Sequence, residues 1–133
     1  MSTYTLEAFK NAHGKLVAKN VLEHIKSNYL LSGHAKTQLK KRSGMLIERE
    51  DGSINYYETK KLINKAIDSN ILAYYNTDGS VNIAIGDYEY FVFCYNEDRN
   101  NWTMITYKEP SWYGISIHEK RKMAIDGFDR KYK

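Results

Sequence analysis

Apolar side chains recur every three or four residues in several segments of the first 70 positions of the chain. This spacing places them on one face of a helix. The pattern predicts helices over the ranges 6–13, 16–27, 34–42 and 59–69. Before the last of these, the Asp51-Gly52 pair separates two short apolar runs, which is typical of a hairpin turn. We therefore expect a hairpin over residues 45–57.

The hydrophobic pattern changes to period two after position 70. The pairs Asp78-Gly79 and Gly86-Asp87 predict tight turns between the alternating segments. Strands are expected over the ranges 71–76, 81–85, 88–95 and 102–107. The third of these is the most apolar, so we expect it to be the central strand.

Helices followed by consecutive strands are typical of an α+β fold. We predict N-terminal helices, an antiparallel four-stranded meander and a short basic C-terminal helix over 116–126. The chain has 133 residues, the length of one domain, so we assign residues 1–133 to a single domain. No run approaches the roughly 18 apolar residues of a membrane span, and no membrane contact is expected.

Composition narrows the expected partners and cofactors. The 20 Lys and Arg residues exceed the 16 Asp and Glu residues. This mild excess favours a polyanion as binding partner but is too small to establish one by itself. Cys94 is the only cysteine, which excludes an internal disulfide and a zinc site built from several cysteines. A single cysteine favours a cytoplasmic location, which would be the cytoplasm of the host cell if the chain is phage-encoded. Phosphate loops, dinucleotide fingerprints and clustered carboxylates are missing, so we expect no cofactor and no metal.

The most informative segment is the predicted helix that follows Ser32-Gly33. His34, Gln38 and Lys41 share one face of this helix, with Arg42 at its edge. A helix N-terminus favours an anion, so the helix would present an imidazole, an amide and two cations to a phosphate. The alternative interpretation is a solvated basic helix.

A wider pattern includes this helix. Ser-Gly-His-Ala at 32–35 is followed by Lys-Lys-Arg, then by a helix with Ile-Asn-Lys-Ala-Ile, and then by strands that end near Ile-Thr-Tyr at 105–107. The pattern resembles the barnase/EndoU/colicin/RelE-like (BECR) ribonucleases of phage and toxin type. That resemblance implies a metal-independent ribonuclease with His34 and Arg42 on its first core helix and Thr106 or Tyr107 on its closing strand. The expected hairpin over 45–57 departs from the family pattern and leaves the placement of Arg42 open.

Metal-independent RNA cleavage uses the 2′-hydroxyl of the RNA as nucleophile and needs a base, an acid and cations around the phosphate. His34 would act as base or acid, and Arg42 would stabilise the phosphate. Thr106 or Tyr107 would donate a hydrogen bond to it. Neighbouring residues of a regular strand point to opposite faces, which groups Thr106 with Trp102 and allows only one of the two candidates into the site.

The basic residues expected to contact nucleic acid are Lys36, Lys41, Lys120 and Arg121. His118, in the last helix, is a second candidate catalytic histidine; the alternatives are that this helix is a solvated face or part of an RNA-binding rim.

Two functions are therefore predicted. The first is a metal-independent endoribonuclease of phage or toxin type, with RNA as its partner and an inhibitor as a further one. The alternative is a small non-enzymatic phage or mobile-element protein that binds a host defence protein or a nucleic-acid complex. Convergence of His34 and Arg42 with Thr106 or Tyr107 in one cleft would favour the enzyme. The oligomeric state is left open.

Overall fold

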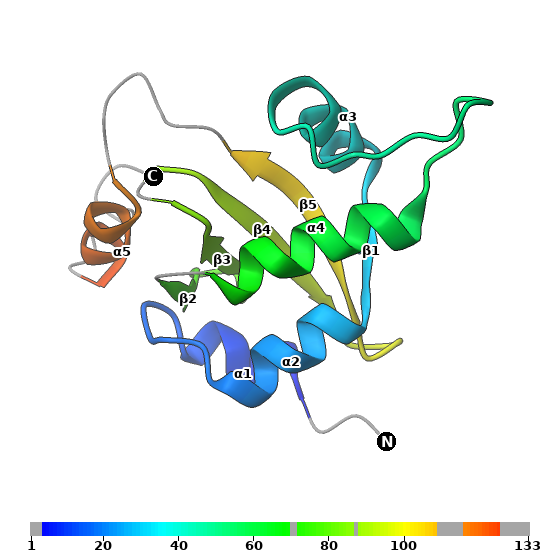
Figure 1. The fold of residues 1–133 in the computed structure, drawn as a ribbon. Helices are drawn as coiled ribbons and strands as arrows, with labels where there is room; N and C mark the ends of the chain where they lie inside the picture. The colour runs from blue at the N-terminus through cyan, green and yellow to red at the C-terminus, as the bar shows by residue number, and fades with distance from the viewer. Residues whose placement is uncertain (1–3, 70–71, 87, 109–115, 126–133) are drawn as a thin grey trace.

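The computed structural model describes residues 4–69, 72–86, 88–108 and 116–125, without the side chains of Arg42, Lys120 and 123–125. Helices dominate the first half of the chain and strands the second half (Figure 1). In chain order the elements are α1 (Leu6–Asn11), α2 (Lys19–Ser27), β1 (Tyr29–Leu31), α3 (Gly33–Arg42), α4 (Tyr56–Asp68), β2 (Ala73–Tyr75), β3 (Val81–Ala84), β4 (Tyr90–Asn96), β5 (Asn101–Lys108) and α5 (Ile117–Ile125).

The strands form one mixed sheet in the order β1-β5-β4-β3-β2. β2 to β5 pair antiparallel with their chain neighbours, and β4 is the central strand, as expected. β1 adds a fifth strand that runs parallel to β5, with Tyr29 opposite Trp102 and Leu31 opposite Met104. The α+β class is confirmed, but the prediction of a four-stranded, wholly antiparallel sheet is wrong. A strand of three residues is too short for alternation to reveal it.

β5 contains an irregularity that changes which side chains share a face. Val92 of β4 pairs with Thr106, but the next residue, Phe93, pairs with Met104. Ile105 is therefore an extra residue in β5, as in a β-bulge. Beyond it, Tyr107 joins Met104 in the main core, and Thr106 lies on the opposite face. The expectation that Thr106 shares a face with Trp102 is wrong because it assumed a regular strand.

Four helices cover one face of the sheet, which we call the inner face. α1, α2, α3 and α4 all contribute to the main core, which they share with inward side chains of the strands. α2 and α4 run across the front of the sheet in Figure 1. Phe9 of α1 stacks on Tyr75 with ring centroids 5.2 Å apart. The indole Nε1 of Trp102 donates a hydrogen bond to His24 Nδ1 at 2.9 Å, so His24 is part of this packing.

The opposite, outer face is covered only in part within the described structure. Ile117 of α5 packs against Leu72, Tyr74 and Ala84, at the β2 and β3 side of the sheet. Arg121 Nε donates a hydrogen bond to the Gly14 carbonyl at 2.9 Å and so ties α5 to the loop after α1. None of the helices in the described ranges is long and apolar enough to cross a membrane.

Candidate functional site

α3 follows β1 directly, and a serine cap holds its first turn. Ser32 Oγ accepts a hydrogen bond from the Ala35 N–H at 3.0 Å and donates one to the Ile105 carbonyl at 3.1 Å. Ser is a favoured N-cap because its hydroxyl pairs with one of the free N–H groups at a helix start. Ala35 and Leu39 are completely buried in the main core. The cap and this buried stripe together fix which side of α3 faces solvent.

His34 and Lys41 are exposed on the solvent side of α3. Among the described residues, the His34 side chain makes no hydrogen bond or ion pair. Gln38 is half-buried, and its Oε1 has no hydrogen-bond partner within the described structure. The side chain of Arg42 lies outside the described part. The expected polar face of α3 is therefore present, but its described side chains at the two ends, His34 and Lys41, face solvent.

The two strand candidates, Thr106 and Tyr107, do not face a common site. Tyr107 is 2% exposed in the main core, where its hydroxyl donates a hydrogen bond to Glu89 Oε2. Thr106 lies on the outer face of the sheet. The two hydroxyls therefore lie on opposite faces of the sheet, and the bulge in β5 places Tyr107, rather than Thr106, in the core.

The basic residues proposed from sequence fall into two separate groups. Lys36 and Lys41 belong to α3, which packs against β5. Arg121 and His118 belong to α5, which packs on the β2 and β3 side of the outer face, and Figure 1 shows α3 and α5 well apart. Arg121 is engaged with the Gly14 carbonyl, and the side chain of Lys120 is outside the described part.

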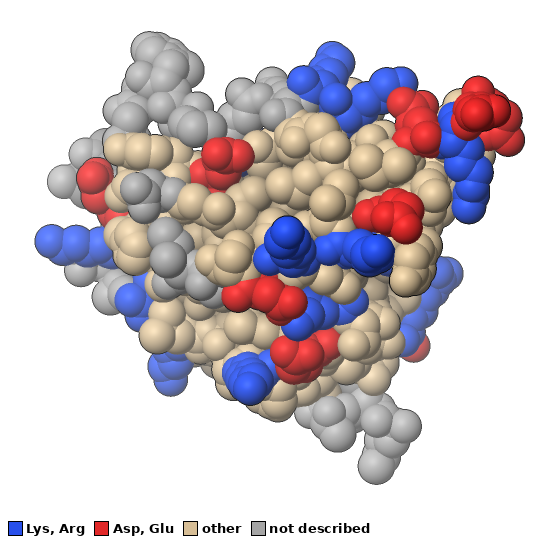
Figure 2. Space-filling model, viewed as in Figure 1, with Lys and Arg blue, Asp and Glu red and all other residues tan. Residues whose placement is uncertain are grey.

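Acidic side chains interrupt the positive charge on the helix side of the molecule. Figure 2 shows Lys and Arg interspersed with Asp and Glu over this face. Lys40 of α3 pairs with Glu48 at 3.1 Å, and Lys26 of α2 pairs with both Glu23 and Asp68. The net charge of the chain therefore does not appear as one continuous basic patch on the face shown.

A groove between β1, α3 and α4 brings lysine side chains next to an exposed aromatic ring. It has a volume of about 390 Å³ and is lined by Leu30, Leu31, Lys36, Tyr56 and Lys60; we call it the α3–α4 groove. Lys36 Nζ lies 5.6 Å from the centroid of the exposed Tyr56 ring. The groove thus combines an accessible ring, two ammonium groups and exposed apolar surface.

Of the residues that line the groove, only Lys36 is among the candidates that the sequence predicts. Tyr56 lies at the end of the hairpin expected over 45–57. The structure contains the hairpin turn, with Glu48 bridged to Ile54, but α4 already begins at Tyr56 after the Asn55 cap. Leu30 is exposed on β1, the strand that the hydrophobic pattern did not reveal. Lys60 lies one turn after Tyr56 on α4, and the pair Tyr56 and Lys60 at i and i+4 is the signal that would have pointed to this surface.

Beneath the groove, a buried phenol adds no charge. Lys60 Nζ lies 5.0 Å from the centroid of the Tyr29 ring. The Tyr29 hydroxyl is buried and has no hydrogen-bond partner among the described residues. Burial raises the pKa of Tyr29 well above its usual value, so the phenol stays neutral beside Lys60.

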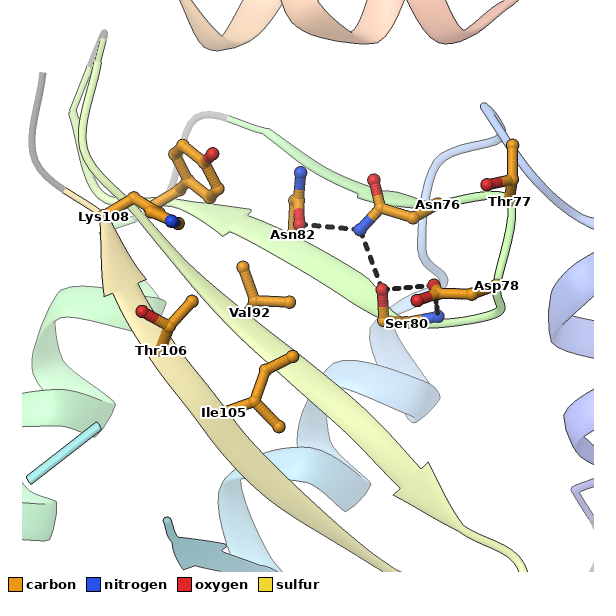
Figure 3. Close-up of a pocket in the computed structure, with 10 residues that line it drawn as sticks. Asn76, Thr77, Asp78, Ser80, Asn82, Val92, Ile105, Thr106 and Lys108 are labelled. Atoms are coloured by element: carbon orange, nitrogen blue, oxygen red, sulfur yellow. Dashed lines mark hydrogen bonds between the residues drawn. The ribbon is translucent and has the colours of Figure 1, made fainter. Parts of the chain in front are cut away.

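A second cavity, of about 400 Å³, lies on the outer face, and we call it the outer cavity (Figure 3). Its lining residues come from β3, β4, β5 and the β2–β3 turn: Asn76, Thr77, Asp78, Ser80, Asn82, Tyr90, Val92, Ile105, Thr106 and Lys108. Asn76 Nδ2 donates hydrogen bonds to Ser80 Oγ at 3.0 Å and to Asn82 Oδ1 at 2.7 Å. Thr106 is the one proposed catalytic residue that lines it.

The described residues offer neither a metal cluster nor an activated thiol. Among them, no group of three or more His, Cys, Asp or Glu side chains is arranged to hold a metal ion. Cys94 is half-buried on β4, and burial, together with the negative charge of Asp78, raises the pKa of its thiol. A raised pKa lowers the fraction of reactive thiolate at neutral pH.

Comparison with known proteins adds no functional assignment: no protein-family model matches the chain, and neither curated proteins nor solved structures give a match. The resemblance to the BECR ribonucleases therefore stays a prediction from a few residues.

Proposed function

We propose that the protein binds single-stranded RNA in the α3–α4 groove without cleaving it. The observation that carries the proposal is that Lys36 lies over the exposed ring of Tyr56 in a groove that Lys60 also lines. Proteins bind single strands by stacking unpaired bases on aromatic rings and by placing cations along the phosphates. A cytoplasmic location, where RNA is available, is part of this proposal.

The groove favours a single strand over a duplex. A base can stack on Tyr56 only when it is not paired inside a helix, whereas a duplex would offer the groove only its backbone. The apolar surface of Leu30 and Leu31 next to the ring extends the contact area for a base. With two lysines at the groove, few phosphates are neutralised, so we expect weak binding that depends strongly on salt.

Binding without cleavage is the interpretation with more support in the geometry. Tyr107 is buried with its hydroxyl engaged, Thr106 lies on the outer face, and His34 is exposed with no partner among the described residues. A general acid or base must lie within hydrogen-bond reach of the proton that it transfers, held by its surroundings. Nothing in the described structure holds the imidazole of His34 in that way.

The proposal can be tested by fluorescence anisotropy with a labelled single-stranded RNA of about ten nucleotides over a range of salt concentrations. Replacing Lys36 or Lys60 by Gln should lower the slope of log K against log salt by about 0.7 for each lost phosphate contact. Tyr56→Ala should weaken binding by about 1 to 3 kcal/mol through lost stacking. Lys65→Gln is the matched control, because Lys65 is an exposed lysine of α4 that does not line the groove.

Two results would contradict the proposal. The first is a loss of affinity in Lys65→Gln equal to that in the groove variants, which would indicate a general charge effect. The second is RNA degradation by the wild-type protein that persists in EDTA and disappears in His34→Ala, because this result would support the metal-independent ribonuclease. An exposed position such as His34 tolerates alanine without loss of fold, which a circular dichroism spectrum checks.

A further inference from the structure

We infer that the outer cavity binds a nucleoside monophosphate whose base carries an exocyclic amino group. This site is independent of the α3–α4 groove, because the two cavities share no lining residue. Three features of the outer cavity support the inference: a cation for the phosphate, an apolar floor for the base, and a carboxylate for the amino group of the base.

The two charged residues of the cavity lie at its opposite ends. In Figure 3, Lys108 lies at one end and Asp78 at the other, with Val92 and Thr106 between them. Lys108 is exposed at the end of β5 and forms no ion pair with any described residue. Its ammonium group is therefore available to a phosphate.

At the other end, the carboxylate of Asp78 is held in place by its own turn. Asp78 Oδ1 accepts hydrogen bonds from the Ser80 N–H at 2.9 Å and from Ser80 Oγ at 2.6 Å. Its second oxygen accepts no hydrogen bond from the described residues. A fixed carboxylate with a free oxygen is an acceptor for an amino group, and Asp and Glu recognise the N4 amino group of cytosine in this way.

The middle of the cavity is neutral and suited to a flat ring. Val92 and Ile105 give it an apolar floor, as Figure 3 shows. Ser80 and Asn82, only 4% and 2% exposed, hold its wall through hydrogen bonds to Asn76. The side chain of Asn82 also donates to the Tyr74 hydroxyl at 3.0 Å, which anchors the wall to β2. The cavity is thus built by a connected set of polar side chains and falls within the usual size range of ligand sites.

A nucleotide matches this order of groups, with its phosphate at Lys108, a planar base over Val92 and Ile105, and an amino edge at Asp78. Cytosine and uracil have the same shape, but cytosine carries an amino donor at C4 where uracil carries a carbonyl acceptor. The carboxylate of Asp78 would bond to the first and repel the second. Cytidine and uridine 5′-monophosphates are therefore a matched pair of probes for this end of the cavity.

The test is isothermal titration of the full chain with cytidine 5′-monophosphate, uridine 5′-monophosphate and cytidine. We expect the cytidine nucleotide to bind about tenfold more tightly than the uridine nucleotide. Lys108→Gln should reduce the affinity for cytidine 5′-monophosphate roughly fivefold and leave the affinity for cytidine unchanged. Asp78→Asn should remove the preference for cytidine over uridine, while the Asn side chain keeps the acceptor oxygen that the turn requires.

Tyr56→Ala separates this site from the proposed RNA groove, since it should leave the binding of cytidine 5′-monophosphate unchanged. Loss of binding in Tyr56→Ala would overturn the assignment of the nucleotide to the outer cavity. The inference is also overturned if millimolar cytidine 5′-monophosphate does not bind, if the two nucleotides bind equally to the wild-type protein, or if Asp78→Asn keeps the preference. Thermal unfolding of each variant shows that the fold is intact.

Discussion

Single residues decide which side chains lie on each face of the sheet. Ile105 is the extra residue of β5, and its insertion places Tyr107 in the core and Thr106 on the outer face. Gly79 acts at a similar scale, because it turns the chain between β2 and β3 with a φ of +85°, a conformation that L side chains rarely adopt. The same turn carries Asp78, so it also shapes one end of the outer cavity.

We predict that Gly79→Ala destabilises the protein more than Gly52→Ala. Both glycines have a positive φ, so each substitution should cost about 1 kcal/mol in backbone strain. A Cβ at Gly79 would also lie 3.0 Å from Leu6 Cδ1 and 3.3 Å from the Leu6 carbonyl oxygen, whereas at Gly52 nothing lies within 4 Å. Urea unfolding measures both losses, and equal losses would show that α1 does not pack closely against the turn.

At the scale of elements, α3 is placed by its two ends and one buried stripe. β1 leads into it, Ser32 caps it, and Ala35 and Leu39 fix its rotation about its axis. α4 is fixed in the same way by the Asn55 cap and its buried face. The groove between the two helices therefore depends on caps and core packing more than on the residues that line it.

We predict that Ser32→Ala lowers the free energy of unfolding by about 1 kcal/mol, because it removes the cap of α3. The bond from Ser32 Oγ to the Ile105 carbonyl is lost as well, which detaches the first turn of the helix from β5. Ser27→Ala is the control, because Ser27 is exposed at the end of α2 and its side chain has no hydrogen bond in the described structure. Chemical denaturation compares the two, and a loss as large in Ser27→Ala would argue against the cap.

For the molecule as a whole, the aromatic core couples stability to high pH. Tyr75 packs against Phe9 on the inner face, and burial, with a smaller contribution from Tyr4, raises the pKa of Tyr75 to about 12. Burial also raises the pKa of Tyr29. The folded protein therefore keeps phenolic protons at pH values at which the unfolded chain releases them.

We predict that the free energy of unfolding falls as the pH rises from about 10, the ordinary tyrosine pKa, to about 12. In this range the native state binds more protons than the unfolded state, so each step in pH favours unfolding. Melting temperatures between pH 9 and pH 12 measure the effect. Tyr75→Phe should flatten this dependence and Tyr57→Phe should not, because Tyr57 is 71% exposed. An unchanged slope in Tyr75→Phe would count against the buried phenol as the cause.

The local pattern of the sequence determined where the helices lie, the Asp78-Gly79 turn and the strands β2 to β5, whereas Asp87 of the expected Gly86-Asp87 turn lies outside the described residues. The break at Ser32-Gly33 predicts the start of α3, and Asp78-Gly79 between alternating segments predicts the β2–β3 turn. Such signals are carried by residues that are close together in the chain, so they can be read without knowledge of the fold. The α+β class followed from the order of these elements.

The tertiary structure alone decided the fifth strand, the bulge and the two cavities. β1 exists because Tyr29–Leu31 meets Trp102–Met104, more than 70 residues away, and three residues carry no pattern of their own. Which of Thr106 and Tyr107 faces the core depends on one extra residue in the pairing of β4 with β5. The α3–α4 groove joins Leu30, Lys36 and Tyr56 from three elements. Register and convergence are properties of contacts between distant segments, and these contacts form only when the chain packs around a shared core.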